Sequence, residues 1–250
     1  MTQRDTHKLL EEIAERVKHD EGFNTRLVSY RAATIIGLCK GPAILELGCG
    51  DGLITCELAR YFQRVVAVDG SNIRVERARE RLKAIKKKGR VIFCITLFEN
   101  LELEERFDTV ITAGILEHID DPIEVLRKAG RWLKPTGVIT IVVPNAMSLH
   151  RRAGRILGLI SDEHELTQMD FSVGHKRYYD LDMLKQHIRE ADLEIDCCGG
   201  LVFKPLSNAQ MEQLSVEITD AFYELGKELP PEYCAEIWAR CTLPKEKGLC

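Results

Sequence analysis

Seven residues between positions 46 and 52 carry the clearest chemical signal in this chain of 250 residues. They read Glu46-Leu47-Gly48-Cys49-Gly50-Asp51-Gly52, directly after an apolar run typical of a strand and before a helix-like segment. Glycines permit a tight turn and let a ligand approach the backbone closely. The loop therefore predicts a site for a nucleotide-like cofactor.

A carboxylate about twenty residues further on extends this signal. Asp69 ends the β-branched run 64–68, and Gly70 and Ser71 follow it. In nucleotide-binding α/β folds an acidic side chain at this position accepts hydrogen bonds from two ribose hydroxyls. Because glycine loop, helix and acid occur in this order, they predict a bound ligand rather than a glycine turn alone.

The glycine spacing distinguishes between two kinds of cofactor. A dinucleotide fingerprint, G-x-G-x-x-G, needs glycine where this chain has Leu53. A pyrophosphate would also be repelled by the carboxylate of Asp51 at a helix start that otherwise favours anions. A nicotinamide-dependent oxidoreductase is therefore the disfavoured alternative.

Three histidines are candidate catalytic residues, because an unperturbed imidazole titrates near neutrality and can act as a base. His118 follows the predicted strand 107–113, His150 follows the next strand, and His175 lies just before a predicted helix. The competing interpretations are a loop-fixing side chain for His118 and a solvated helix face for His150. His175 is also a candidate for lining the substrate pocket.

Basic side chains gather after the fifth predicted strand: His150, Arg151, Arg152, Arg155, Lys176 and Arg177. Arginine suits bidentate contacts to carboxylate or phosphate groups. These residues predict an anionic acceptor, such as a nucleotide sugar or a carboxylate metabolite. The alternative is a solvated, charged helix face.

Strands and helices alternate between residues 43 and 145. The predicted strands, at 43–47, 64–68, 91–95, 107–113 and 137–143, are continuous apolar runs of the kind buried on both faces. The alternation predicts a doubly wound parallel sheet with helices on both sides. Ligands of such sheets bind beyond the carboxyl ends of the strands. The chemistry is therefore expected in the loops at 48–52, 69–71, 97–99, 113–118 and 144–145.

The flanking segments complete the expected chain. A helical lead covers 5–38, with a break at Gly22-Phe23-Asn24. After residue 145 the patterns predict helices at 147–160, 181–191 and 209–229, a strand at 193–203 interrupted by two glycines, and a last strand at 233–243. A strand that follows a chain reversal can join the sheet edge in antiparallel orientation.

Composition excludes several classes of protein. The formal net charge of -4 gives no general affinity for nucleic acid. Nine cysteines without a C-x-x-C pair indicate free thiols. The charged start of the chain lacks a signal-peptide pattern, and no apolar run reaches the ~20 residues of a membrane helix. These features predict a cytoplasmic protein without a membrane span.

Taken together, the motifs resemble those of class I S-adenosylmethionine (SAM)-dependent methyltransferases, in the branch with the ubiquinone-type and small-molecule enzymes. Residues 46–52 match the first motif of the family and 66–71 the second. Residues 107–110, Leu116-Glu117-His118-Ile119 and Asp121-Pro122 resemble the fourth strand and its loop, and 133–137 the turn before the fifth strand.

The resemblance implies a Rossmann-like methyltransferase fold with a mostly parallel sheet of seven strands, the last one antiparallel. It implies an N-terminal helical cap at 1–40 and a methyltransferase domain at 41–250, with lid insertions at about 146–180 and 205–232. The implied activity is methyl transfer from SAM to a small molecule, on oxygen, nitrogen or carbon, with S-adenosylhomocysteine as product and no metal. A SAM-binding module without activity is an alternative. A nucleic-acid methyltransferase is disfavoured because the Asn/Asp-Pro-Pro-Tyr/Phe motif is absent.

The resemblance also implies roles at matching positions. The three loop glycines would line the methionine half of SAM, with Glu46 at its amino group, Arg31 at its carboxylate and Asp69 at the ribose. Glu99 stands where the family commonly has aspartate. The full set of expected cofactor contacts is Tyr30, Arg31, Glu46, Gly48, Cys49, Gly50, Gly52, Asp69, Gly70, Ser71, Leu97, Phe98, Glu99, Ala113, Gly114, Leu116 and His118. The expected substrate contacts are Asn145, Arg151, Arg152, His175, Arg177, Tyr178 and Tyr179.

Overall fold

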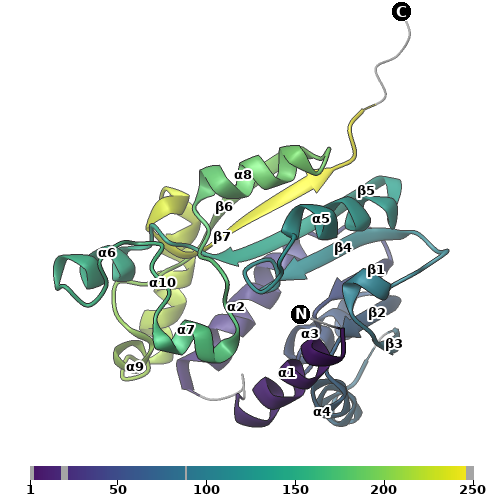
Figure 1. The fold of residues 1–250 in the computed structure, drawn as a ribbon, viewed down its shortest axis with the longest axis horizontal. Coiled ribbons are helices and arrows are strands. Elements are labelled where there is room, and N and C mark those ends of the chain that lie inside the picture. Colours follow the sequence, from purple (N-terminus) through teal and green to yellow (C-terminus); the bar gives the residue numbers. More distant parts are fainter. Residues whose placement is uncertain (1–2, 18–21, 88, 246–250) are drawn as a thin grey trace, which may run out of the picture.

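The computed structural model describes residues 3–17, 22–87 and 89–245. The strands among them form one sheet in the order β3-β2-β1-β4-β5-β7-β6 (Figure 1). β7 pairs antiparallel with β5 and β6, and the other pairs are parallel. This confirms the predicted doubly wound sheet with an antiparallel last strand. The strands are β1 (Ala43–Leu47), β2 (Arg64–Asp69), β3 (Arg90–Ile95), β4 (Phe107–Ala113), β5 (Leu133–Pro144), β6 (Glu194–Phe203) and β7 (Cys234–Thr242).

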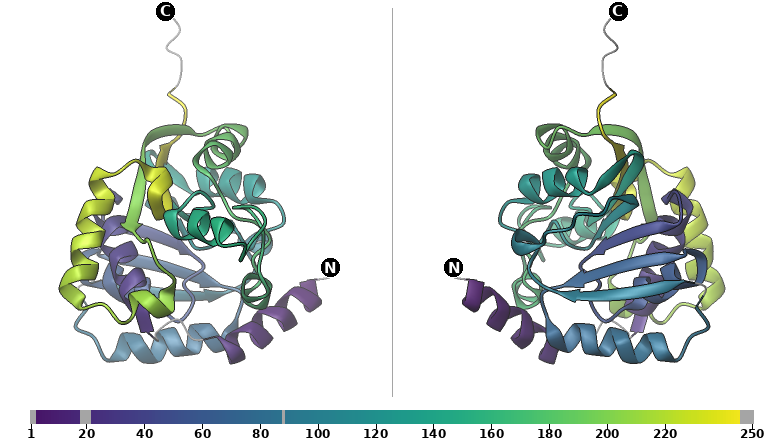
Figure 2. Two further views of the ribbon diagram at one scale, coloured as in Figure 1. Left: turned by 90° about the vertical axis from the view of Figure 1, so that its left-hand side faces the viewer. Right: turned by 90° about the vertical axis from the view of Figure 1, so that its right-hand side faces the viewer.

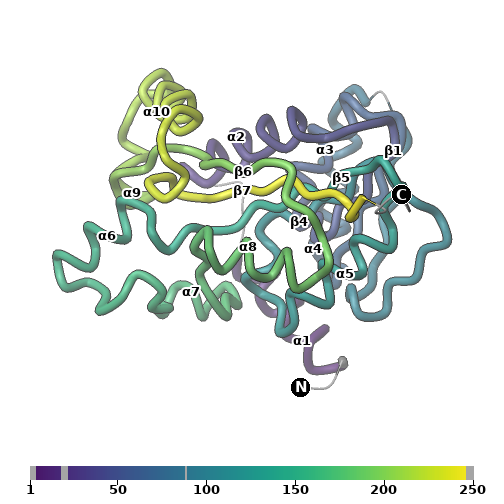
Figure 3. The backbone as a smooth tube through the Cα atoms, turned by 90° about the horizontal axis from the view of Figure 1, so that it is seen from above, coloured from purple at the N-terminus to yellow at the C-terminus, as the bar shows by residue number. Residues whose placement is uncertain are grey.

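Helices cover both faces of the sheet because successive strand residues point to opposite sides and both sides are apolar. Leu45, Val110 and Ile141 pack on the side of α5 (Pro122–Arg131) and α8 (Leu181–Glu190). Ile44, Ile111 and Val142 pack on the opposite side. That side is covered by α2 (Gly22–Leu38), α3 (Leu53–Tyr61), α4 (Asn72–Lys83) and α10 (Val216–Glu228). Figure 3 shows α2 and α10 on one side of β6 and β7, and α8 on the other.

The remaining helices lie at the carboxyl ends of the parallel strands or beside them. Figure 1 shows α6 (Leu149–Ile156) and α7 (Gln168–Val173) beyond the ends of β4 and β5, with α9 (Asn208–Met211) below α6. Two single turns complete these elements: η1 (Phe98–Asn100) follows β3, and η2 (Pro231–Tyr233) precedes β7. α1 (Gln3–Arg16) packs against α4, where Arg77 donates to the carbonyl of Ala14 at 2.8 Å (Figure 2).

Several predicted boundaries were wrong, and single capping residues explain two of the differences. α2 begins at Gly22 rather than after Asn24, and β5 begins at Leu133, four residues before the predicted start. The helix predicted at 147–160 ends at Ile156, because Gly158 adopts φ 70° and closes a C-terminal cap. The helix predicted at 209–229 is two helices, because Ser215 caps the start of α10.

The last strand pair explains why two glycines do not interrupt β6. A Cβ on Gly199 would lie 2.5 Å from the Trp238 ring, and the Trp238 indole donates to the Gly200 carbonyl at 3.0 Å. The glycines therefore accommodate a neighbouring side chain within a continuous strand.

Three other expectations concern the cysteines, a membrane span and the bounds of the cap and the domain. The cysteines that the structure describes are free thiols, as predicted. None of the described helices is long and apolar enough to cross a membrane. The predicted cap at 1–40 and domain at 41–250 include residues 1–2, 18–21, 88 and 246–250, which lie outside the described residues.

Candidate active site

The glycine loop is anchored to the second strand and open on its other side. The amides of Gly48 and Cys49 both donate to the carbonyl of Val68, at 2.7 and 3.0 Å. Gly48 and Gly50 have φ of 76° and 51°, a region that favours glycine. A Cβ on Gly50 would approach nothing closer than an Arg74 nitrogen at 3.7 Å. At Gly50 the loop backbone therefore presents a surface that a ligand can approach.

Gly52 has a different reason to be glycine. A Cβ there would lie 2.6 Å from Cβ of Ala78 in α4. Its small size lets α3 and α4 pack closely, which is a structural requirement independent of any ligand. The side chain of Ile115, which the sequence analysis did not single out, lies over Gly48, where a Cβ would meet it at 1.8 Å.

Asp69 lies at the carboxyl end of β2, and its carboxylate joins two loops. Its Oδ2 accepts from the amide of Gly50 and its Oδ1 from the amide of Ser71, both at 2.9 Å. Burial raises the pKa of Asp69, although these two hydrogen bonds oppose the shift. An ionised carboxylate has about four acceptor positions, so two remain for hydroxyl donors.

Glu46 is a nearly buried acid in the middle of the sheet, at 2% exposure. Its Oε2 accepts from the Thr55 hydroxyl at 2.6 Å. Burial raises the pKa of Glu46 to about 8, and the nearby charge of Asp69 adds to the shift. A carboxyl group in this state gains most from a ligand that brings a positive charge.

The predicted adenine-flanking residues lie next to the glycine loop. Leu97 is buried, and the Phe98 ring reaches to 3.8 Å from the position of a Gly48 Cβ. Glu99 is exposed, and its carbonyl accepts from Lys128 at 2.7 Å.

The first helix covers the same end of β2, which sequence reasoning did not find. His7 contacts the Gly70 carbonyl at 3.0 Å. Glu11 accepts from the Ser71 hydroxyl and the Asn72 amide, both at 2.7 Å. The one available signal was an acid on an amphipathic helix, which is too common to be specific.

The loop after β4 brings together three side chains of different types. Glu117 is buried, and burial raises its pKa to about 7. The ring centroids of His118 and His175 are 4.7 Å apart. The ligand atoms of Glu117, His118 and His175 all lie within 4.8 Å of one another. These residue types suit a transition metal, but a metal ion there would lie near the positive charge of Arg31, which interacts with Glu117.

His175 lies beside a carboxylate, although its Nδ1 makes no hydrogen bond within the described residues. Its Nδ1 lies 3.3 Å from Oδ1 of Asp170, which also accepts from the Tyr178 hydroxyl at 2.8 Å. Thr167 donates to the other oxygen of Asp170 at 2.7 Å. Burial would raise the pKa of Asp170, but contacts with His175, Thr167 and Tyr178 outweigh it and hold the pKa well below its usual range. Asp170 is therefore a stable anion beside the imidazole.

The comparisons with known proteins agree with this geometry. The chain matches the methyltransferase domain family over residues 5–197. It is 26% identical over 179 residues to the ubiquinone biosynthesis O-methyltransferase of Rhodopseudomonas palustris, covering 71% of this chain and 68% of that protein. The corresponding enzyme of Xanthomonas oryzae is 28% identical over 171 residues, with 67% and 69% covered.

The chain belongs to the class I SAM-dependent methyltransferases. Its cofactor is SAM, which rules against the nicotinamide alternative. A SAM-dependent methyltransferase of Thermotoga maritima has the same fold, with a TM-score of 0.66, 20% identity, and 94% of this chain and 100% of that chain covered. The N-methyltransferase NodS of Bradyrhizobium japonicum, solved with S-adenosylhomocysteine, has a TM-score of 0.56 at 16% identity and covers 88% of each chain.

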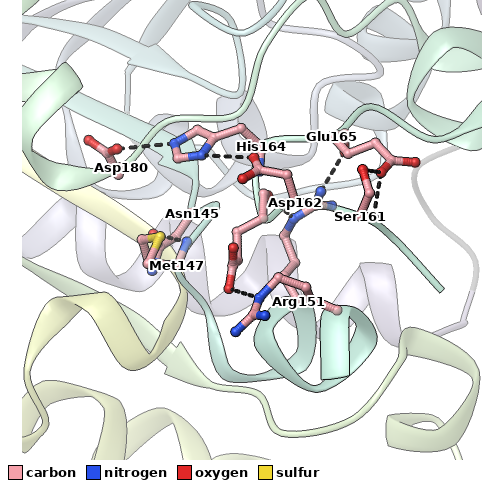
Figure 4. A network of polar contacts seen from close by, with 10 residues as sticks. Asn145, Met147, Arg151, Ser161, Asp162, His164, Glu165 and Asp180 are labelled. Carbon is pink, nitrogen blue, oxygen red and sulfur yellow. Dashed lines mark hydrogen bonds and ion pairs between the residues drawn. The ribbon is translucent and has the colours of Figure 1, made fainter. Parts of the chain in front are cut away.

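The predicted substrate residues of this methyltransferase mostly hold its own loops. The Arg151 guanidinium donates to the carbonyls of Glu163 and Glu165, at 2.7 and 2.6 Å, and lies 3.7 Å from the Tyr178 ring centroid. Figure 4 shows this arginine within a network that also contains His164, which lies between Asp162 and Asp180. These contacts order the segment between α6 and α7.

Arg177, Asn145 and Tyr179 have similar structural partners. Arg177 donates to the carbonyls of Leu116, Ile119 and Asp120, which shapes the loop that carries Glu117 and His118. The Asn145 amide donates to the carbonyls of Pro231, Glu232 and Cys234. The buried Tyr179 contacts His187 through its hydroxyl at 3.2 Å. Their polar atoms are thus engaged by the protein rather than directed at an acceptor.

Tyr30 and Arg31, which were expected to close over the cofactor, point to different partners. The Tyr30 hydroxyl donates to Asp220 at 2.6 Å, and its ring stacks on Tyr223 in α10. Arg31 donates from two nitrogens to both oxygens of Glu236 in β7. Tyr30 therefore joins α2 to α10. Arg31 lies beside Gly114, where a Cβ would be 3.4 Å from its guanidinium.

His150 differs from the other two histidines in its surroundings. Burial and the positive charges of Lys204 and Arg151 lower its pKa to about 3. A neutral imidazole with so low a pKa is a weak proton acceptor. Of the three predicted bases, His150 has the least suitable environment, and His175 lies beside a buried carboxylate.

Proposed function

We propose that this methyltransferase methylates a hydroxyl or amine of an anionic small molecule, with His175 as the general base. The observation that carries the proposal is the contact between His175 and the buried carboxylate of Asp170. A carboxylate beside one imidazole nitrogen favours the tautomer that carries its proton on that nitrogen, which leaves the other nitrogen to accept a proton. Relatives named for O-methylation and a structural neighbour named for N-methylation are compatible with either acceptor atom.

In this proposal the cofactor occupies the loops at the ends of β1, β2 and β3. Gly48 and Gly50 lie against its methionine half, Asp69 accepts from the ribose hydroxyls, and Phe98 flanks adenine. Glu46 receives the amino group, which supplies the positive charge that its raised pKa favours. SAM, when bound, supplies a methyl group on its sulfonium sulfur. The acceptor bonds to the methyl carbon in line with the breaking carbon–sulfur bond, and S-adenosylhomocysteine leaves.

The rest of the chain aligns the acceptor and excludes water. The helical lead at 1–40 caps the cofactor, and the segments 146–180 and 205–232 form the lid over the acceptor. Alignment of reacting groups can contribute on the order of 7–11 kcal/mol to catalysis. His175 takes the proton that the acceptor loses, which typically adds ~10²–10⁴ in rate. Glu117 and His118 border the same space and hold the acceptor rather than the proton.

The experiment has two stages. Calorimetric titration with SAM and S-adenosylhomocysteine, with NAD as control, first measures cofactor binding. S-adenosylhomocysteine formation is then measured with a panel of carboxylates and phosphates that carry a hydroxyl or an amine. With an accepted substrate, His175→Gln should lower kcat by about 10² or more and leave SAM affinity unchanged.

The matched control is His164→Gln, because His164 also pairs with aspartates but orders the lid segment. It should lower kcat much less than His175→Gln does, because it removes no proton acceptor. A His175→Gln enzyme that turns over as fast as wild type would remove the base from the proposal. Activity confined to acceptors without a negative charge would remove the anionic acceptor.

A further inference from the structure

A buried lysine at the end of β6 has no acidic partner among the residues that the structure describes. Lys204 follows Phe203 at the carboxyl end of the strand and is 7% exposed. Within residues 3–17, 22–87 and 89–245, no carboxylate lies within 4.0 Å of its ammonium, and no side-chain hydrogen bond involves it. The acid that most influences Lys204 is Glu236, and both oxygens of Glu236 accept from Arg31.

Two arginines increase the positive charge at this place. Arg151 interacts electrostatically with Lys204, and its own hydrogen bonds go to uncharged backbone carbonyls. The Arg152 guanidinium lies 5.3 Å from the Tyr233 ring centroid, and its buried Nε has no hydrogen-bond partner among the described residues. Phe203 pairs with Cys234, so Lys204 and Tyr233 are the next residues along this antiparallel pair. The register thus brings Arg152 and Lys204 to the same end of β6 and β7.

The start of α6 adds an unpaired hydroxyl next to these cations. The hydroxyl of Ser148 is fully buried and bonds neither to the helix it precedes nor to any other described residue. The ring of His150 adds no donor, because it is neutral and gives its one N–H to the backbone of Lys204, which leaves the buried Nδ1 without a proton. A helix N-terminus carries a partial positive charge and favours anions.

These groups are costly to bury without a ligand. An unsatisfied buried donor lowers the stability of the fold, and an unpaired buried charge lowers it further. Burial lowers the pKa of Lys204 to about 8, so the ammonium remains mainly protonated at neutral pH. One anion would compensate the ammonium, the Arg152 guanidinium and the Ser148 hydroxyl together.

The location matches that of an acceptor. Ligands of doubly wound sheets bind beyond the carboxyl ends of the strands. The glycine loop and Asp69 lie at the ends of β1 and β2, whereas Lys204 and the start of α6 lie at the ends of β6 and β5, across β4 in the strand order. Arg155 pairs with Glu163 and Lys176 with Asp120, so these other predicted basic residues already have acidic partners.

We propose that Lys204, Arg152 and the first turn of α6 form a subsite for the carboxylate or phosphate group of the methyl acceptor. The inference rests on the proposed function, because it assigns the negative charge of the acceptor to particular residues. Lys204 was not among the residues expected from the sequence, whereas Arg152 was.

The test uses inorganic phosphate and acetate as probes on the full-length protein. The midpoint of thermal unfolding is measured against increasing phosphate or acetate, with chloride keeping the ionic strength constant. We expect the wild-type midpoint to rise with at least one probe, and the stronger probe identifies the preferred group. Lys204→Met and Arg152→Gln should each weaken the apparent affinity for that probe at least tenfold. Arg155→Gln, which removes an exposed cation of the same helix, should leave it unchanged.

SAM titration of each variant separates this inference from the proposed function. Wild-type affinity for SAM in Lys204→Met and Arg152→Gln shows that both variants are folded and that the cofactor half is intact. If SAM binds but neither probe stabilises the wild type, or if both variants respond to the probes as wild type does, the subsite is overturned while the methyltransferase remains. Probe binding lost in both variants, beside a His175→Gln enzyme of full activity, supports the subsite and overturns the base.

Discussion

The proposed cofactor half and the proposed acceptor half of the carboxyl edge each contain a buried ionisable group, and the two groups are opposite in type. In the cofactor half, burial raises the pKa of Glu46 to about 8. In the acceptor half, burial lowers the pKa of Lys204 to about 8. The same cause shifts an acid and a base in opposite directions because burial disfavours whichever form is charged. Each half thus carries a cost that a ligand of opposite charge would offset.

The two halves also differ in how the chain builds them. Most of the cofactor half comes from residues 46–71, in two consecutive strand-to-helix turns. The proposed acceptor half combines residues from the β4 loop, α6, α7 and β6, and the Arg31–Glu236 ion pair that borders Lys204 and Glu117 joins residues 205 positions apart. Motifs of adjacent residues therefore describe the cofactor half, whereas contacts between distant residues build the acceptor half.

The largest expected effect would test the cofactor half alone. Asp69→Asn should weaken SAM binding about 100-fold. The substitution removes the charge from the two proposed hydrogen bonds between Asp69 and the ribose hydroxyls, and such bonds are worth roughly 1.5–3 kcal/mol each. Calorimetric titration measures the change. Glu105→Gln, an exposed acid paired with Arg64, is the control and should bind SAM normally. Unchanged binding in Asp69→Asn would contradict the assignment of this half to SAM.

The pH dependence of stability would test the charge state of Glu46. Its folded pKa of about 8 lies above the ordinary value of 4.5. Its stabilising contribution is therefore complete below about pH 4.5 and is lost as the pH rises through 8. Between these values the free energy of unfolding should fall by up to about 1.4 kcal/mol per pH unit. Urea unfolding of Glu46→Gln should show a slope smaller by this amount, and an identical slope would remove Glu46 as the cause.

Lys204 offers the matching test in the acceptor half. Lys204→Met should raise the free energy of unfolding at pH 7 by about 1–3 kcal/mol, because a buried charge is replaced by an apolar side chain of similar length. It should raise KM for an anionic acceptor more than it lowers kcat. Urea unfolding and steady-state kinetics measure the two effects. A variant less stable than wild type would show that Lys204 has a compensating partner and would break the comparison.

The smallest effect concerns the helix that covers the cofactor half. Glu11→Gln keeps the size of a side chain that accepts from Ser71 and Asn72, but removes its charge at the start of α4. We expect SAM affinity to fall a few-fold, in line with about 0.3–1 kcal/mol for a charge at a helix N-terminus. Glu12→Gln, one position along α1 and paired with exposed Lys8, is the control. Equal affinities in both variants would show that α1 does not influence the cofactor half.

The sequence by itself determined the sheet, its antiparallel last strand and the family, because these depend on periodicity and on motifs of a few adjacent residues. It also placed Glu46, Gly48, Gly50 and Asp69 at one edge, since the carboxyl ends of parallel strands meet there. The ends of α6 and the split between α9 and α10 were missed. They depend on single capping residues, Gly158 and Ser215, within otherwise helical patterns.

Only the tertiary structure decided which charged residues already have partners. Arg151 and Arg177 looked available for an anion, but backbone carbonyls of distant loops engage them. Lys204 looked like one lysine at the end of a strand, but it is buried beside cations, and no acid among the described residues pairs with it. Spacing along the chain gives no information about such pairings. They are fixed when packing brings separate segments together and removes the water that would otherwise solvate each charge.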